Sequence, residues 1–189
     1  MVVFDPLNTL LLADVEVPVR VVADELAGIR YGALEYKLRR GLSIELPLRL
    51  AVPLWQKGEV ELDVDKLPNF SELNKIRWKE ERARELQRLE RGFYVKVELL
   101  LARLKASAED DGEKAQLLRR SKAAIVDIIR ARMKKIVELA VTNPRPEREI
   151  MRRMSVEERM LYVALCSILN DWYTFMVSRL EKGEELWRP

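Results

Sequence analysis

The hydrophobic positions of this chain follow two different periods, which divide its 189 residues into two parts. Up to about Asp65, apolar and polar side chains alternate, as they do along strands that are buried on one face. From Ser71 onward, apolar side chains recur every three or four residues, which is the period of a helix with one buried face. The two patterns predict an α+β protein, with a small N-terminal β-rich domain over residues 1–66, a linker at about 67–70 and a C-terminal all-helical bundle domain over residues 71–189.

The clearest strand pattern lies near the start of the chain. The segment VEVPVRV, residues 15–21, places a valine at every second position. Pro18 within it has no N–H to donate to a neighbouring strand, so the pattern predicts a strand at the edge of a sheet. Two further apolar runs, residues 29–38 and 42–46, are separated by Gly41, which predicts a hairpin that turns at this glycine.

The rest of the small domain contains one predicted helix and one more strand. Proline is favoured at the first position of a helix, so a short helix is expected to begin at Pro47, and Pro53 is expected to distort it. After Gly58, the alternating segment VELDV, residues 60–64, predicts the last strand. A unit of about 65 residues is near the lower limit for independent stability, so we expect it to rest on another part of the protein.

The helical part contains three long apolar patterns. The first places six apolar residues on one helix face, and Gly92 is expected to kink or break that helix. The second covers residues 113–141, and the segment 143–146 with its two prolines is expected to end it. Ser155 and Glu158 have the spacing of a capping box, which predicts the start of the third helix. The six apolar residues of the first pattern are Leu86, Leu89, Phe93, Val97, Leu100 and Leu104.

The third helix is the most apolar segment of the chain. Residues 160–177, MLYVALCSILNDWYTFMV, place apolar side chains on almost every face, so protein or lipid must cover them. Asn170 and Asp171 interrupt the run, and we therefore expect no membrane span. Two neighbouring helices cover about half to two-thirds of a helix surface. The remainder is too apolar for a soluble monomer, so the sequence predicts a stable oligomer.

Charged side chains are abundant and nearly balanced, with 34 Lys and Arg against 31 Asp and Glu and a net charge of +3. Within residues 75–91, Glu80 lies four positions before Arg84, so these charges are expected to pair along an exposed helix face. The helix over residues 113–141 is more strongly basic and leaves two alternatives open, contact with phosphates or contact with an acidic partner protein. Aromatic residues are not interleaved with its charges, so we expect no base-stacking surface there.

The sequence offers little of the chemistry that enzymes use. It has no histidine, which excludes a Ser-His-Asp triad and a histidine metal site. Its single cysteine, Cys166, forms no internal disulfide and suits a reducing cytoplasm. The glycines do not form a phosphate-binding loop. Two acidic clusters, Asp63 with Asp65 and residues 109–111, are expected to be solvated. We therefore expect no catalytic site, no cofactor and no metal ion.

Four segments resemble the subunits of the GINS DNA replication complex. Residues 41–54, GLSIELPLRLAVPL, are similar to the small domain of these subunits, and residues 61–67 are similar to its exit. Residues 125–140, IVDIIRARMKKIVELA, resemble a helix of the family's helical domain, and residues 155–172 resemble its last helix. The order of the segments resembles the archaeal subunit type with the β-rich domain first, which is related to the eukaryotic second and third partner subunits.

The resemblance implies a structural role without a catalytic site. In this family, helical domains pack side by side into a tetramer, in archaea with two copies of each of two subunit types, and the assembly holds the MCM helicase ring to a RecJ-like partner at the replication fork. Direct contact with DNA is compatible with this role but is not required by it. The alternative is a basic helical nucleic-acid-binding module. The expected subunit contacts are Leu118, Ile125, Ile129, Met133, Trp172, Tyr173 and Met176, and the small domain is expected to contact the bundle or the helicase through Leu48, Leu54 and Trp55.

Overall fold

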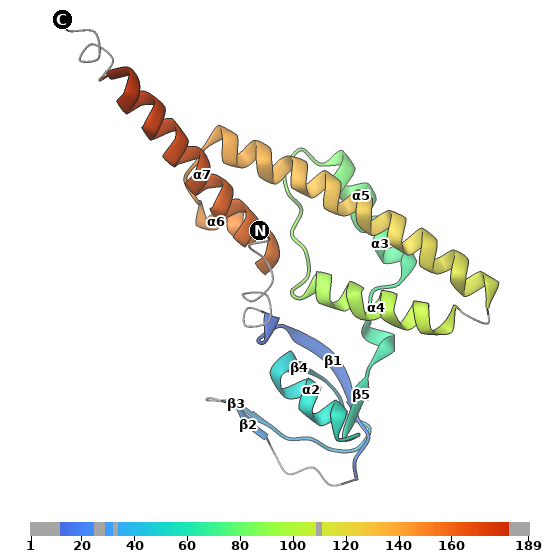
Figure 1. The fold of residues 1–189 in the computed structure, drawn as a ribbon. Coiled ribbons are helices and arrows are strands. Elements are labelled where there is room, and N and C mark those ends of the chain that lie inside the picture. Colours follow the sequence, from blue (N-terminus) through green and yellow to red (C-terminus); the bar gives the residue numbers. More distant parts are fainter. Residues whose placement is uncertain (1–11, 25–28, 32–33, 109–110, 182–189) are drawn as a thin grey trace, which may run out of the picture. The chain divides into compact units, whose positions relative to one another are not determined.

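The computed structural model describes residues 12–24, 29–31, 34–108 and 111–181, and these form two compact units (Figure 1). The first, here called the sheet unit, comprises residues 1–74 and 90–123. The second, the helical unit, comprises residues 75–89 and 124–189. The strands precede all of the long helices, so the predicted α+β class is confirmed. The predicted domain boundaries at residues 66 and 71 stay a prediction.

The sheet unit is built around a three-stranded antiparallel sheet in the order β4-β1-β5. Its strands are β1 (Glu16–Val21), β4 (Ser43–Pro47) and β5 (Val60–Leu62), and a 3₁₀ turn, η1 (Val64–Lys66), follows the last of them. The predicted helix after Pro47 is α2 (Leu48–Gln56), which continues through Pro53. Ala51 and Leu54 of α2 pack with the valines of β1 in one core.

The strand β1 lies in the centre of the sheet, so the prediction of an edge strand was wrong. Along one side β1 pairs with β4 from Glu16 to Arg20, but along the other side it pairs with β5 only from Val19 to Val21. The carbonyl of Pro18 accepts a hydrogen bond from the amide of Asp63, one residue past the end of β5. The missing N–H of Pro18 would point toward the same end of β5, where the hydrogen-bonded pairing of β1 with β5 has already stopped.

The predicted hairpin around Gly41 was also wrong in its pairing. Residues 29–38 fold on themselves instead, because β2 (Ile29–Tyr31) pairs with β3 (Leu34–Tyr36). Gly41 does turn the chain, with φ of 79°. Its amide donates to the carbonyl of Val21, which directs the following strand onto β1 rather than back onto the preceding residues.

The first long helical pattern divides into two helices, so its six apolar residues do not share one face as predicted. The helix α3 (Phe70–Arg82) ends well before α4 (Phe93–Ser107) begins, and Gly92 precedes α4 in the left-handed conformation with φ of 68°. Leu86, in the non-helical segment between them, packs in the core of the helical unit. Val95 of α4 instead joins the core around the sheet.

Replacing Gly92 with alanine is expected to destabilise the sheet unit, because two effects add at this position. Alanine resists the left-handed conformation, and its Cβ would lie 2.7 Å from Cγ1 of Val15. We expect the free energy of unfolding in urea to fall by about 1–3 kcal/mol. Gly58→Ala is the matched control, because Gly58 has a similar φ of 73° but open space at its Cβ position. An equal loss in both variants would contradict the packing part of the argument.

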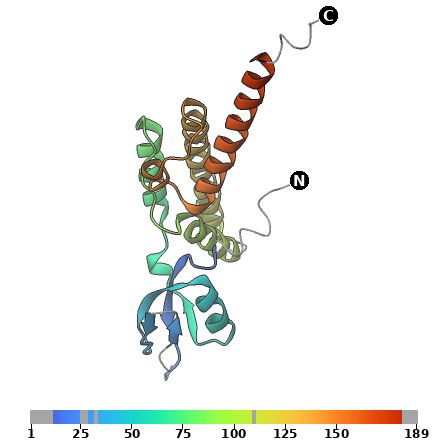
Figure 2. The ribbon, with the colours of Figure 1, turned by 90° about the vertical axis from the view of Figure 1, so that its left-hand side faces the viewer.

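The remaining helices confirm the second and third patterns. They are α5 (Gly112–Thr142), the short α6 (Arg148–Met151) and α7 (Val156–Glu181). The capping box is formed in both directions, since the amide of Glu158 donates to Oγ of Ser155 at 3.2 Å and the amide of Ser155 donates to Oε2 of Glu158 at 3.0 Å. In the helical unit, the C-terminal half of α7 extends beyond the end of α5 (Figure 2).

Candidate subunit interface

A buried ionic network fixes the start of α7 against α5. Arg132 of α5 has a side chain that is only 1% exposed. Its Nε donates to Oε1 of Glu158 at 2.6 Å and its Nη2 donates to Oε2 of the same carboxylate at 2.7 Å. Its Nη1 donates to Glu80 of α3 at 2.8 Å, and Lys135 also donates to Glu80, at 2.6 Å. Such paired and hydrogen-bonded ions are tolerated in a protein interior, whereas isolated ones are not.

The same network holds the non-helical segments of the unit. Arg132 donates to the carbonyl of Gln87 at 2.7 Å and to that of Arg153 at 3.1 Å. Glu158 therefore has two roles, because it caps the first turn of α7 and also binds the arginine. The predicted pairing of Glu80 with Arg84 on an exposed face was wrong, since the Glu80 side chain is fully buried against Arg132 and Lys135. Periodicity within α3 could not reveal the burial of Glu80, because its partner cations come from α5, more than 50 positions away in the sequence.

The N-terminal half of α7 buries one of its faces against its own chain. Tyr162 and Cys166 are buried with Ile136 and Ala140 of α5 in the core of the helical unit, together with Leu86 and Met154. Burial raises the pKa of the Tyr162 hydroxyl and that of the Cys166 thiol. Cys166 is therefore held in its neutral, less nucleophilic form at neutral pH.

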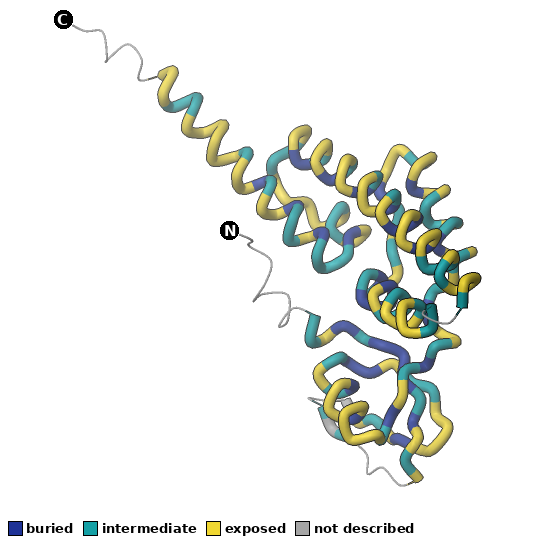
Figure 3. Tube along the Cα trace, turned by 45° about the vertical axis from the view of Figure 1, so that its right-hand side comes forward, coloured by how far each residue is buried: buried dark blue, intermediate teal, exposed yellow. Residues whose placement is uncertain are grey.

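The C-terminal half of α7 is not covered (Figure 3). Trp172, Tyr173 and Phe175 are 61%, 63% and 58% exposed, and Ile168 and Leu180 are exposed as well. By length and composition alone, this one helix of the described chain is apolar enough to cross a membrane. That property is weak support for a membrane span, since helices from the cores of soluble proteins share it, and Asn170 and Asp171 lie within the apolar stretch.

A second exposed apolar stripe runs along the part of α5 that belongs to the helical unit. Its members are spaced three or four residues apart and therefore share a face. Val141 at its end lines a shallow pocket of about 450 Å³ together with Trp172 and Tyr173, so the stripe is continuous with the exposed part of α7. We call the whole surface the α5–α7 surface. Its residues are Val126, Ile129, Met133, Val137 and Val141 on α5, and Ile168, Trp172, Tyr173, Phe175 and Leu180 on α7.

Four of the predicted contact residues lie on this surface: Ile129, Met133, Trp172 and Tyr173. Sequence reasoning missed Val126, Val137 and Val141, although they continue the same helical spacing. The other predicted contact residues are less accessible. Leu118 and Met176 are half-buried. Ile125 lies on the inward side of α5 and is buried within its own chain.

The predicted contact residues of the small domain also differ in exposure. Leu54 is buried in the core of the sheet unit, and Leu48 packs against that core. Both side chains thus stabilise α2 on the sheet. Trp55 is 64% exposed and is the one of the three that presents a large apolar surface to solvent.

The acidic clusters have partners within the chain. Arg20 bonds to both Asp63 and Asp65, and Ser43 donates a hydrogen bond to Asp63. The Ser43 hydroxyl and the Arg20 guanidinium lower the pKa of the Asp63 carboxyl. Asp111 accepts hydrogen bonds from amides in the first turn of α5, whereas residues 109 and 110 lie outside the described residues. Among the described side chains, no group of three or more His, Cys, Asp or Glu is placed to hold a metal ion.

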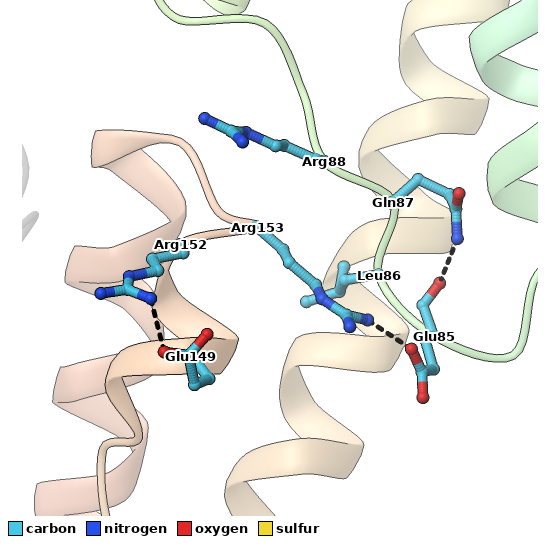
Figure 4. Close-up of a pocket in the computed structure, with 7 residues that line it drawn as sticks. All are labelled: Glu85, Leu86, Gln87, Arg88, Glu149, Arg152 and Arg153. Carbon is cyan, nitrogen blue, oxygen red and sulfur yellow. Dashed lines mark hydrogen bonds and ion pairs between the residues drawn. The ribbon is translucent and has the colours of Figure 1, made fainter.

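A polar pocket of about 570 Å³ lies beside α6 (Figure 4). Most of the charges that line it are paired, because Arg152 pairs with Glu149 and Arg153 pairs with Glu85. The Arg153 guanidinium lowers the pKa of the Glu85 carboxyl. An open, ion-paired surface of this kind lacks the apolar walls that enclose a small-molecule ligand.

Comparison with known families identifies the helical part of the chain. Residues 69–176, more than half of the sequence, match the GINS complex protein helical bundle domain. The chain belongs to the GINS family. The match contains the whole buried network and nearly all of the α5–α7 surface. As a GINS subunit, the protein has a role in DNA replication and assembles with other GINS subunits, and members of this family are structural. No curated protein matches the sequence.

Proposed function

We propose that this protein is the β-domain-first subunit of an archaeal GINS complex, related to the eukaryotic second and third partner subunits. The order of the chain supports this assignment, because the sheet and α2 precede the family's helical domain, which begins at residue 69. The segments around Gly41 and after Glu61, which resemble the small domain of this subunit type, occupy β4, α2 and β5.

The α5–α7 surface is the site where a sibling subunit binds. The single observation that carries this proposal is the exposure of Trp172, Tyr173 and Phe175 on a helix whose other half buries one face against its own chain. Burial of a few hundred Å² of such surface at about 25 cal/mol per Å² contributes several kcal/mol to association. Aromatic residues and methionine are also enriched in the cores of interfaces. The complex we propose has two copies of this chain and two of its sibling.

The assembled complex acts without catalysis as a link between the MCM helicase and a RecJ-like partner at replication forks in the cytoplasm. Trp55 on α2 is the part of the small domain that we assign to contact with the helicase or the bundle, because it is exposed and apolar. We assign the half-buried Leu118 and Met176 to the subunit contacts as well.

Co-expression with a candidate sibling subunit, followed by native mass spectrometry, tests the proposal. We expect a complex with two copies of each chain that survives high salt, because apolar contacts are insensitive to ionic screening. The isolated chain should self-associate or require the sibling for solubility. A soluble monomer that does not bind the sibling at any salt concentration would contradict the assignment.

A further inference from the structure

The outward side of α3 differs from what its sequence predicts. Along the sequence KIRWKEER, four basic residues are mixed with Glu80 and Glu81, and the spacing predicts that Glu80 pairs with an arginine on the exposed face. In the structure, Glu80 turns inward to Arg132 and Lys135. Its negative charge is therefore removed from the solvent side, and Lys75, Lys79 and Arg82 are left exposed there.

These three cations and Trp78 form one narrow face, here called the α3 outer face. At 100° per residue, the four side chains lie within an arc of about 100° around the helix, and Glu81 lies outside that arc. Among the described residues, no carboxylate lies within ion-pair distance of Lys75, Lys79 or Arg82. The face is therefore positively charged without an internal counter-ion.

Trp78 adds an exposed ring to this charged face. Its side chain is 53% exposed, although the guanidinium of Arg82 lies over one side of the indole, 4.1 Å from the ring centroid. The cation–π contact orders both side chains and holds Arg82 beside the ring. A flat aromatic surface flanked by fixed positive charge is the combination with which proteins bind unpaired bases and their phosphates.

We propose that the α3 outer face binds single-stranded nucleic acid. A base stacks on Trp78, and the adjacent phosphates lie against Lys75, Lys79 and Arg82. A single strand fits better than a duplex, because the faces of paired bases are closed to a side chain that approaches from outside. The face from Lys75 to Arg82 is only about 10 Å long, so it contacts few nucleotides and its affinity depends strongly on salt.

The site is separate from the α5–α7 surface, since none of its residues belongs to that surface. Its function therefore does not require the proposed assembly. Two copies of the chain in one complex would present two such faces, which raises the apparent affinity for a strand long enough to reach both.

Fluorescence anisotropy of a labelled oligothymidylate of about 16 nucleotides tests the proposal with the full-length chain. We expect Trp78→Ala to weaken binding by about tenfold or more. The double variant Lys75→Gln/Lys79→Gln should reduce the slope of log affinity against log salt by about 1.4, because each phosphate contact with a single strand contributes about 0.7. Trp55→Ala is the matched control, because it removes an exposed tryptophan outside this face, and it should bind as the wild type does.

Several outcomes would overturn the proposal. Binding by Trp78→Ala that equals wild-type binding excludes a stacking role. Equal affinity for a duplex of the same length shows that only phosphates are contacted. If Trp78→Ala leaves oligonucleotide binding intact but prevents capture of the sibling, the face contacts protein instead. Native mass measurement of the Trp78→Ala complex separates these results from a failure of assembly, because we expect that complex to form normally.

Discussion

Replacing Arg132 with methionine is expected to lower the free energy of unfolding of the helical unit by about 3–5 kcal/mol. The substitution removes the bidentate partner of the buried Glu158 carboxylate, and Glu80 keeps Lys135 as its one cation, beside the amide of Gln87. An unpaired charge in the interior costs more than the lost pairing itself is worth. Urea denaturation followed by far-UV circular dichroism measures the change.

Two controls separate this effect from a general loss of arginine. Arg152→Met removes an exposed guanidinium that pairs with Glu149 at the surface, so we expect a change within about 0.5 kcal/mol. The combined variant Arg132→Met/Glu80→Gln/Glu158→Gln removes the buried charges together and should recover part of the lost stability. If Arg132→Met and Arg152→Met unfold at the same urea concentration, the network does not stabilise the fold as we infer.

Replacing Trp172 with alanine is expected to weaken assembly with the sibling subunit by about 2–4 kcal/mol, which is roughly 30- to 1,000-fold in the dissociation constant. Tryptophan at the centre of an apolar surface commonly dominates binding energy, and Trp172 adjoins both stripes of the α5–α7 surface. Analytical ultracentrifugation of the purified mixture measures the shift.

The isolated Trp172→Ala chain should keep its stability, because the side chain is largely exposed before a partner binds. Trp78→Ala serves as the matched control, since it removes an exposed tryptophan from another part of the chain and should leave the assembly intact. Loss of assembly in both variants would indicate a general effect of tryptophan removal. Unchanged assembly in Trp172→Ala would place the subunit contact elsewhere.

Local sequence rules were sufficient for the two longest helices, α5 and α7. The extent of α5, its end at the proline segment and the capping box at Ser155 all follow from residues within a few positions of one another. The exposed apolar half of α7 was also predictable, because a helix that is apolar on all sides exceeds the surface that two neighbours can cover.

Features that depend on distant residues could not be predicted in this way. The central position of β1 depends on where β5 ends, and no pattern within residues 15–21 reports that. The inward turn of Glu80 depends on Arg132, which lies 52 positions away. The spacing of charges along α3 placed Glu80 on an exposed face, whereas the structure buries it and leaves Lys75, Lys79 and Arg82 exposed.

The anchoring of α7 at one end has a consequence for how quickly complexes form and separate. Because Glu158 and Arg132 hold the first turn, a partner meets a rod that is already ordered rather than a segment that must fold on contact. Binding to such a preorganised element loses little conformational entropy. Loosening the anchor should therefore shorten the lifetime of the complex, even though the anchor lies far along the helix from Trp172.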